Sequence, residues 1–97
     1  MYSNILKNDI DYIYSNLNNK KYFNNSQILI TGCCGFLGFY FIEFFVKYIE
    51  SLKIKKIYFL DINESKLIEY RNKYKHKKIN FLKFDIINDD LEIIKTK

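Results

Sequence analysis

The sequence predicts an α/β fold in which parallel strands alternate with helices. Three observations lead to this prediction: short runs rich in Ile or aromatic residues, stretches of helical length between them, and turn-forming residues where they meet. With 97 residues and 48% apolar composition, the chain has enough side-chain surface for one modest core. We therefore expect one domain, or part of one.

The first predicted element is an amphipathic helix over residues 4–17. Its apolar residues recur at intervals of four, three and four, which places them on one stripe of the helix; they are Leu6, Ile10, Ile13 and Leu17. An Asn-rich polar linker follows at residues 18–26. Residues 1–25 are thus interpreted as an N-terminal helix and linker that precede the sheet.

Five elements follow the linker and spell β-α-β-α-β. In order, we expect a strand at Gln27–Thr31, a helix from residue 36 to about residue 52, a strand at Lys56–Asp61, a helix over residues 64–74 and a strand at residues 79–85. Strands joined by helical crossovers pair in parallel, and the crossovers are right-handed. Residues 26–97 therefore predict one mononucleotide-binding half of a doubly wound sheet, truncated, with a third helix beginning near residues 89–94.

Three glycines separate the first strand from its helix in the segment Thr-Gly-Cys-Cys-Gly-Phe-Leu-Gly. Gly32 permits a tight exit from the strand, Gly35 lets the backbone approach phosphate oxygens, and Gly38 lets the helix lie close to the sheet. The helix N-terminus beyond them offers unpaired N–H groups to an anion. This turn is predicted to receive a cofactor pyrophosphate; a tight turn without a ligand is the alternative.

Carboxylates end the second and third predicted strands. Asp61 lies 23 positions after Gly38, where it is suited to accept hydrogen bonds from the adenosine ribose; a helix N-cap or turn role is the alternative. A carboxylate there repels a 2′-phosphate and no Arg follows the glycine turn, so NAD is preferred over NADP. Asp85 and Ile86 stand within reach of the adenine, although Asp is also a common residue at strand ends.

The spacing T-G-x-x-G-x-x-G resembles that of the extended short-chain dehydrogenase/reductase family, the NAD-dependent epimerase/dehydratase group with a Rossmann-type fold. The similarity covers about residues 27–90, with departures at Cys33 and Cys34, where small residues are usual. It implies a set of cofactor-binding residues: Gly32, Gly35, Phe36, Leu37 and Gly38 at the phosphates, Asp61 at the ribose, and Asp85 with Ile86 at the adenine.

The resemblance implies an NAD-binding segment of a nucleotide-sugar epimerase, dehydratase or decarboxylase, holding the ADP half of the dinucleotide. The family's catalytic Tyr-x-x-x-Lys pair has no convincing counterpart, because Tyr74 and Lys78 have the spacing but precede the third strand. We therefore expect no catalytic residues here, and a nucleotide sugar as partner only if the chain continues. The alternative is a non-catalytic, truncated Rossmann module that acts through nucleotide binding or protein contacts.

Composition argues against several other classes. The formal charge is +5, and the lysines of residues 73–78 are interpreted as a solvated loop rather than a nucleic-acid site. Adjacent Cys33 and Cys34 match neither a disulfide framework nor a zinc spacing, which favours a reducing, cytoplasmic setting without a metal. Charged residues interrupt the apolar run after residue 36, so no membrane span is expected.

The predicted topology leaves the first strand at an edge of the sheet. In a doubly wound order of 3-2-1-4, Gln27–Thr31 pairs with the second strand and with a strand that follows residue 97. An apolar edge with unpaired N–H and C=O groups invites association. We expect the rest of a longer polypeptide to cover this edge, with self-association when residues 1–97 are made alone. The alternatives are a second copy of the chain, or the N-terminal helix folded back against the sheet.

Overall fold

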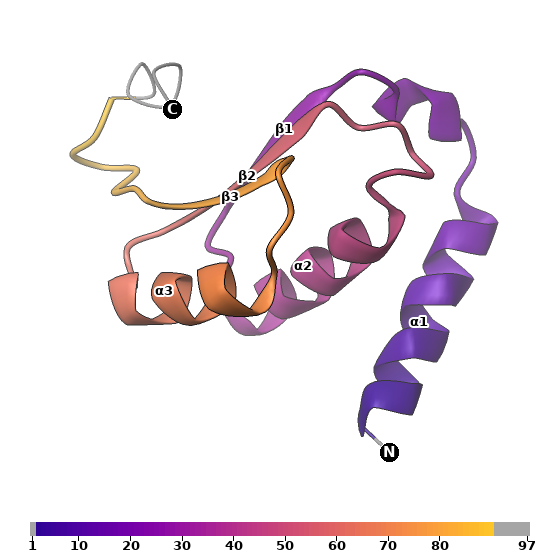
Figure 1. Ribbon diagram of the computed structural model, residues 1–97, viewed down its shortest axis with the longest axis horizontal. Helices are drawn as coiled ribbons and strands as arrows, with labels where there is room; N and C mark the ends of the chain where they lie inside the picture. The colour runs from indigo at the N-terminus through magenta and orange to yellow at the C-terminus, as the bar shows by residue number, and fades with distance from the viewer. Residues whose placement is uncertain (1, 91–97) are drawn as a thin grey trace.

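The computed structural model describes residues 2–90, with side-chain environments from residue 6 onward, and contains a three-stranded parallel sheet (Figure 1). The strands are β1 (Gln27–Thr31), β2 (Lys56–Asp61) and β3 (Ile79–Lys83), in the spatial order β1-β2-β3. Helices α2 (Phe36–Tyr48) and α3 (Glu64–Lys73) connect them and lie on the same face of the sheet. The predicted α/β fold, a Rossmann-like half with an N-terminal helix, is confirmed.

The main core lies between the sheet and helices α2 and α3. Ile30, Phe59 and Phe81 are register partners across the three strands, and Phe59 stacks on Phe81 with ring centroids 5.2 Å apart. Side chains alternate between the faces of a strand, so Leu60 points to the opposite face, where it packs with Phe84. The period of two along each strand thus separates a helix-covered face from a second, smaller cluster.

Helix α1 (Tyr2–Asn16) packs on α2. The Tyr14 and Tyr48 rings stack with centroids 3.8 Å apart, and the Lys47 ammonium lies 2.5 Å from the Asp11 carboxylate. Two members of the predicted apolar stripe, Leu6 and Ile10, are buried, whereas Ile13 stays half-exposed. A 3₁₀ turn at Lys20–Phe23 occupies part of the predicted linker.

Helix α2 ends at Tyr48, earlier than the predicted end near residue 52, but turns follow it and the N–H of Leu52 still donates to the carbonyl of Tyr48 at 2.8 Å. Lys53 adopts a left-handed conformation (φ 56°), and the N–H of Ile54 donates to the carbonyl of Ile49 at 3.1 Å. This is the Schellman arrangement, in which the 6→1 bond and the buried Ile54–Ile49 pair close a helix end. Within residues 2–90, neither α2 nor another helix is long and apolar enough to cross a bilayer.

The last two elements end slightly earlier than predicted. Helix α3 ends at Lys73, one residue before the predicted end, with Tyr74 as its C-cap. Strand β3 ends at Lys83 rather than at residue 85, because the Asp85 N–H donates to the Asp89 carboxylate and residues 86–88 form a turn. The helix predicted at residues 89–94 lies mostly outside the described residues.

Candidate functional site

The glycine turn begins with a backbone conformation that favours glycine. Gly32 has φ +71°, in the region that side-chain-bearing residues rarely adopt. Its N–H still extends the sheet by donating to the Leu60 carbonyl at 2.8 Å, while its carbonyl accepts the N–H of Gly35 at 3.1 Å. The chain therefore leaves β1 and reverses within a few residues, as the sequence predicts for Gly32.

Gly38 is required by the approach of α2 to the turn. An ideal Cβ on Gly38 would lie 2.3 Å from the carbonyl oxygen of Cys33, far inside a normal contact. Gly35 is different, since its Cβ would lie 3.4 Å from the Gly32 oxygen, an ordinary contact, and its φ of −81° suits any residue. Packing thus explains glycine at position 38 but not at position 35.

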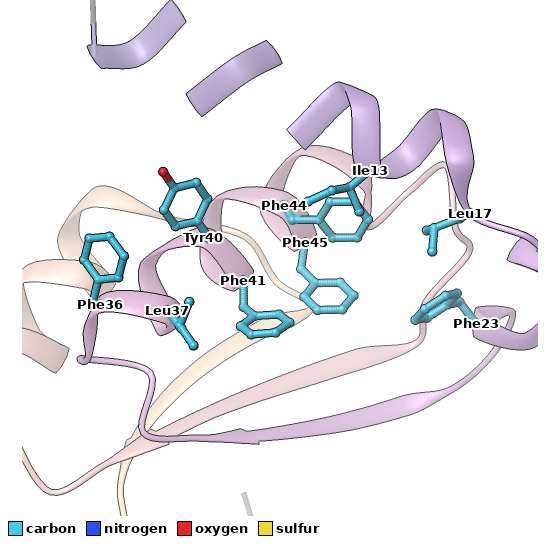
Figure 2. Close-up of a pocket in the computed structure, with 9 residues that line it drawn as sticks. All are labelled: Ile13, Leu17, Phe23, Phe36, Leu37, Tyr40, Phe41, Phe44 and Phe45. Carbon is cyan, nitrogen blue, oxygen red and sulfur yellow. The ribbon is translucent and has the colours of Figure 1, made fainter. Parts of the chain in front are cut away.

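The start of α2 presents backbone donors at the turn. Gly35 is the N-cap and, as a glycine, offers no side-chain hydrogen bond to the N–H groups of the first turn. These N–H groups carry the positive end of the helix dipole. The side chains of Phe36 and Leu37 lie on the outer surface of α2, 81% and 68% exposed, and line an apolar groove rather than the strand ends (Figure 2). Any role at the phosphates would therefore come from their backbone.

Asp61 is joined to the glycine turn by hydrogen bonds. One carboxylate oxygen accepts the N–H of Cys34 at 3.0 Å, and the other accepts the N–H of Asn63 at 2.9 Å. The first bond links residues 27 positions apart in the sequence. Asn63, rather than Asp61, caps α3, since its side-chain oxygen accepts the N–H of Lys66. The N-cap alternative for Asp61 is thus wrong, although its bond to Asn63 is a local turn contact.

The ends of the three strands enclose a cleft of about 350 Å³. Its lining comes from the ends of β1 and β2 and from residues that follow each of the three strands: Thr31, Gly32, Leu60, Asp61, Ile62, Phe84, Asp85, Ile86 and Ile87. Four of the eight predicted cofactor-binding residues line it, namely Gly32, Asp61, Asp85 and Ile86. The carboxyl edge of a parallel sheet is the usual place for a ligand in open α/β folds.

The Asp85 carboxylate stabilises its own turn. It accepts the side-chain N–H of Asn88 at 2.6 Å and the backbone N–H of Ile87 at 2.9 Å. These two donors, Asn88 first, lower the pKa of Asp85 below its ordinary value of 3.8. Ile86 beside it is 69% exposed and borders the cleft. Asp85 therefore holds the loop in place, and Ile86 presents the free apolar surface.

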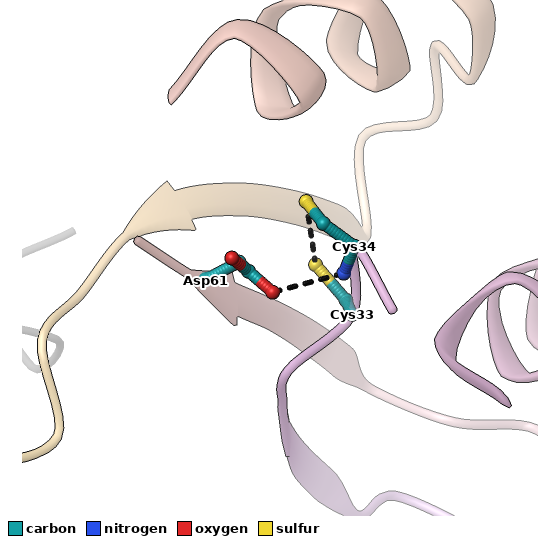
Figure 3. Close-up of side chains that lie close together, drawn as sticks. All are labelled: Cys33, Cys34 and Asp61. Atoms are coloured by element: carbon teal, nitrogen blue, oxygen red, sulfur yellow. Dashed lines mark hydrogen bonds between the residues drawn. The ribbon is translucent and has the colours of Figure 1, made fainter. Parts of the chain in front are cut away.

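Two thiols and one carboxylate come together beneath the turn (Figure 3). The ligand atoms of Cys33, Cys34 and Asp61 all lie within 4.8 Å of one another, an arrangement that the adjacent cysteines alone do not predict. Burial is the main cause that raises the pKa of each thiol, and Asp61 adds to it. Metal ligation needs thiolates, so both the raised pKa values and the full burial of Cys33 favour a packing role for this cluster.

The Tyr74–Lys78 spacing does not form a catalytic pair. The Tyr74 ring is buried against Phe81, while the Lys78 ammonium lies 2.6 Å from the Glu50 carboxylate. A tyrosinate base requires a nearby cation and access to substrate. These contacts agree with the interpretation that Tyr74 and Lys78 have this spacing by chance.

Comparison of the chain with protein-family models, with curated proteins and with solved structures found no match in any of the three.

Proposed function

We propose that this chain binds the ADP half of NAD at the glycine turn and the adjoining strand ends. The observation that carries the proposal is the cleft lined by Gly32, Asp61 and Ile86, where Asp61 is also hydrogen-bonded to the turn that leads into α2. Its volume of about 350 Å³ lies in the range of roughly 300–1,000 Å³ that is typical of small-molecule sites. The dinucleotide is suggested by the chemistry of the groups around this cleft.

The start of α2 is the proposed pyrophosphate site. An anion there would accept N–H groups of the first helical turn and meet the positive end of the helix dipole. Gly35 supports this role, because neither its backbone conformation nor its packing requires a glycine. The absence of a Cβ matters where a ligand approaches the backbone closely.

Asp61 is the proposed ribose-binding residue, and its hydrogen bonds leave room for that role. Each carboxylate oxygen accepts one backbone N–H, from Cys34 or Asn63. An ionised carboxylate has about four acceptor positions, so two remain for the ribose hydroxyls. The backbone donors also fix the carboxylate at the cleft, which reduces the entropy lost when a ligand binds.

Ile86 is the proposed apolar contact for the adenine, and Asp85 positions it. The Asp85 carboxylate is occupied by Asn88 and Ile87, whereas the Ile86 side chain is exposed at the rim of the cleft. Burying the exposed part of Ile86 against a base would be favourable at about 25 cal/mol per Å². Asp85 would thus act through the loop rather than by touching the ligand.

The resemblance to nucleotide-sugar epimerases and dehydratases extends the proposal to an NAD-dependent enzyme of that class, in which these residues form the cofactor-binding segment. When bound, the nicotinamide would supply hydride transfer. The chain's own described residues would bind and orient the adenosine end. A non-catalytic binding module is the second candidate, and the exposed apolar groove of Figure 2 favours protein contacts for it.

Titration with NAD and NADP, followed by calorimetry or by amide chemical shifts, tests the proposal. NAD should bind more tightly than NADP, because the Asp61 carboxylate repels a 2′-phosphate; a tenfold preference corresponds to about 1.4 kcal/mol. Asp61→Asn should weaken NAD binding and reduce the preference. Glu69→Gln removes one exposed charge on α3 and serves as the matched control.

Equal or tighter binding of NADP would refute the assignment of Asp61. A folded wild-type chain that binds no dinucleotide would refute the proposed function as a whole. Chemical-shift changes are expected at residues 32–38, at Asp61 and around Ile86; changes confined to other surfaces would contradict the site.

A further inference from the structure

The outer edge of β1 is unpaired within the described residues. Strand β1 pairs with β2 alone, and the sheet order places it at the edge, as the sequence predicts. The carbonyl of Ser26 accepts the N–H groups of Lys55 and Lys56 where β2 begins, and the N–H of Gly32 donates to the Leu60 carbonyl of β2. Because backbone groups alternate in direction along a strand, the N–H and C=O groups of Gln27, Leu29 and Thr31 point away from the sheet.

This edge carries none of the usual protection against association. Natural edge strands commonly contain Lys, Pro or a bulge that blocks a second strand. Strand β1 has the sequence Gln-Ile-Leu-Ile-Thr, without charge or proline, and it pairs with β2 in unbroken register over all five residues. It therefore offers a regular, uncharged template for another strand.

An apolar groove of about 530 Å³ runs along α2 (Figure 2). Its lining is uncharged and comes from α1 and the residue that follows it, the 3₁₀ turn and α2: Ile13, Leu17, Phe23, Phe36, Leu37, Tyr40, Phe41, Phe44 and Phe45. The Phe39 ring lies under the Lys73 ammonium of α3. An α-helix has 3.6 residues per turn, so Leu37 and Phe41 lie about 160° and 200° around α2 from Phe39. Both side chains therefore face away from α3, toward the side of the sheet that ends in β1.

We infer that, when residues 1–97 stand alone, a second copy of this chain covers both surfaces, with the two β1 strands paired antiparallel about a two-fold axis at Leu29. This register sets Leu29 opposite Leu29 and Gln27 opposite Thr31. All three outward-pointing residues then fall in hydrogen-bonded pairs. The same surface serves both copies, as an isologous dimer requires.

The same axis brings the grooves together. A two-fold axis that relates antiparallel strands within one sheet stands perpendicular to that sheet, so α2 and its symmetry mate lie on the same face. The two helices run antiparallel, and the exposed start of one, with Phe36 and Leu37, faces the groove of the other. A continuous six-stranded sheet results, and two apolar grooves are covered in one step.

The exposed area is sufficient for a weak to moderate dimer. At about 200 Å² for a fully exposed aromatic side chain, Phe36 (81% exposed) and Phe41 (48%) present roughly 250 Å². The exposed parts of Ile13, Leu29 and Leu37 bring this to about 500 Å² of apolar surface per copy. A standard interface buries about 800 Å² per partner, and the strand backbone supplies much of the remainder.

Sedimentation equilibrium on the 97-residue chain over a wide concentration range tests the inference. We expect a reversible monomer–dimer equilibrium that stops at the dimer. Phe41→Glu should weaken it at least tenfold, because it places two charges in the dry interface. Ile68→Glu introduces the same change at a position of matched exposure, 46% against 48%, on the exposed surface of α3, and should leave the dimer intact.

Amide exchange provides a second measurement that needs no variant. In the dimer, the amides of Leu29 and Thr31 should exchange slowly, and dilution should remove their protection. The amides of Ile28 and Ile30, which face β2, should stay protected at all concentrations. A monomer at every concentration, growth into open-ended assemblies, a dimer insensitive to Phe41→Glu, or exchange at Leu29 that does not depend on concentration would each overturn the inference. Dinucleotide binding is measured separately, at the strand ends, so the two proposals can fail independently.

Discussion

Replacing Gly38 by alanine places a carbon atom where the backbone of the glycine turn already lies. The new Cβ would fall 2.3 Å from the carbonyl oxygen of Cys33 and 2.5 Å from its carbonyl carbon. Non-bonded carbon atoms settle at roughly 3.5–4.0 Å, so α2 and the turn would have to separate by about 1 Å. No side-chain rotation can relieve this contact, because both atoms belong to the main chain.

The expected net loss for Gly38→Ala is about 2 kcal/mol of unfolding free energy. Overpacking a tight site costs about 1–3 kcal/mol, and a contact with rigid backbone belongs at the upper end. Alanine regains about 1 kcal/mol through its higher helix propensity. For a domain of this size, the melting temperature should fall by about 8–16 °C.

Thermal unfolding followed by far-ultraviolet circular dichroism measures this loss. Gly35→Ala is the matched control, since its Cβ would lie 3.4 Å from the Gly32 oxygen and its φ is already negative. This N-cap change should cost less than about 1 kcal/mol. A Gly38→Ala variant that melts at or above the wild-type temperature would refute the argument that close packing requires this glycine.

Two further predictions concern the turn and helix α1. Gly35→Val should fold like the wild type yet lose at least tenfold in NAD affinity, because its side chain obstructs the approach to the α2 N-terminus; unchanged affinity in calorimetry would contradict the phosphate site. Hydrogen bonds from the Lys47 ammonium and, to a smaller extent, from the Tyr48 hydroxyl lower the pKa of Asp11 below its ordinary value of 3.8. The stabilisation that the Asp11 carboxylate gains from these two partners is therefore present at neutral pH and is lost as pH falls through the lowered pKa. Asp11→Asn should abolish that pH-dependent loss in the near-ultraviolet dichroism of the tyrosines, whereas Asp9→Asn on the exposed side of α1 should leave it unchanged.

The strands and their order could be predicted because each signal is local. Short runs rich in Ile or aromatic residues indicate strands, and a glycine turn followed by an apolar stretch indicates a strand-to-helix junction. The turn that closes the chain after α2, near Leu52, was also predictable, even without a glycine there. Lys53 takes the left-handed position instead, because the buried Ile54 and Ile49 fix the helix end.

The contacts that join distant segments could not be predicted in the same way. The spacing between Gly38 and Asp61 indicated a ribose-binding acid, but not that the Cys34 N–H would hold its carboxylate. The apolar stripe of α1 indicated a buried face without saying which surface it covers. In the structure that surface is α2, because stacking of Tyr14 on Tyr48 and the Asp11–Lys47 pair define the position of the helix.

Helix α2 links the two proposals, because its sequence is apolar on nearly every side. An all-apolar helix is stable only when its whole circumference is covered. The sheet covers Ile42 and Phe45, and α1 covers Phe44 and Tyr48. The half-exposed Phe41 remains on the flank of α2 that borders the apolar groove of Figure 2. An amphipathic helix with a polar residue at this position would satisfy the glycine turn equally well, so the proposed phosphate site does not explain this flank, whereas the proposed dimer would.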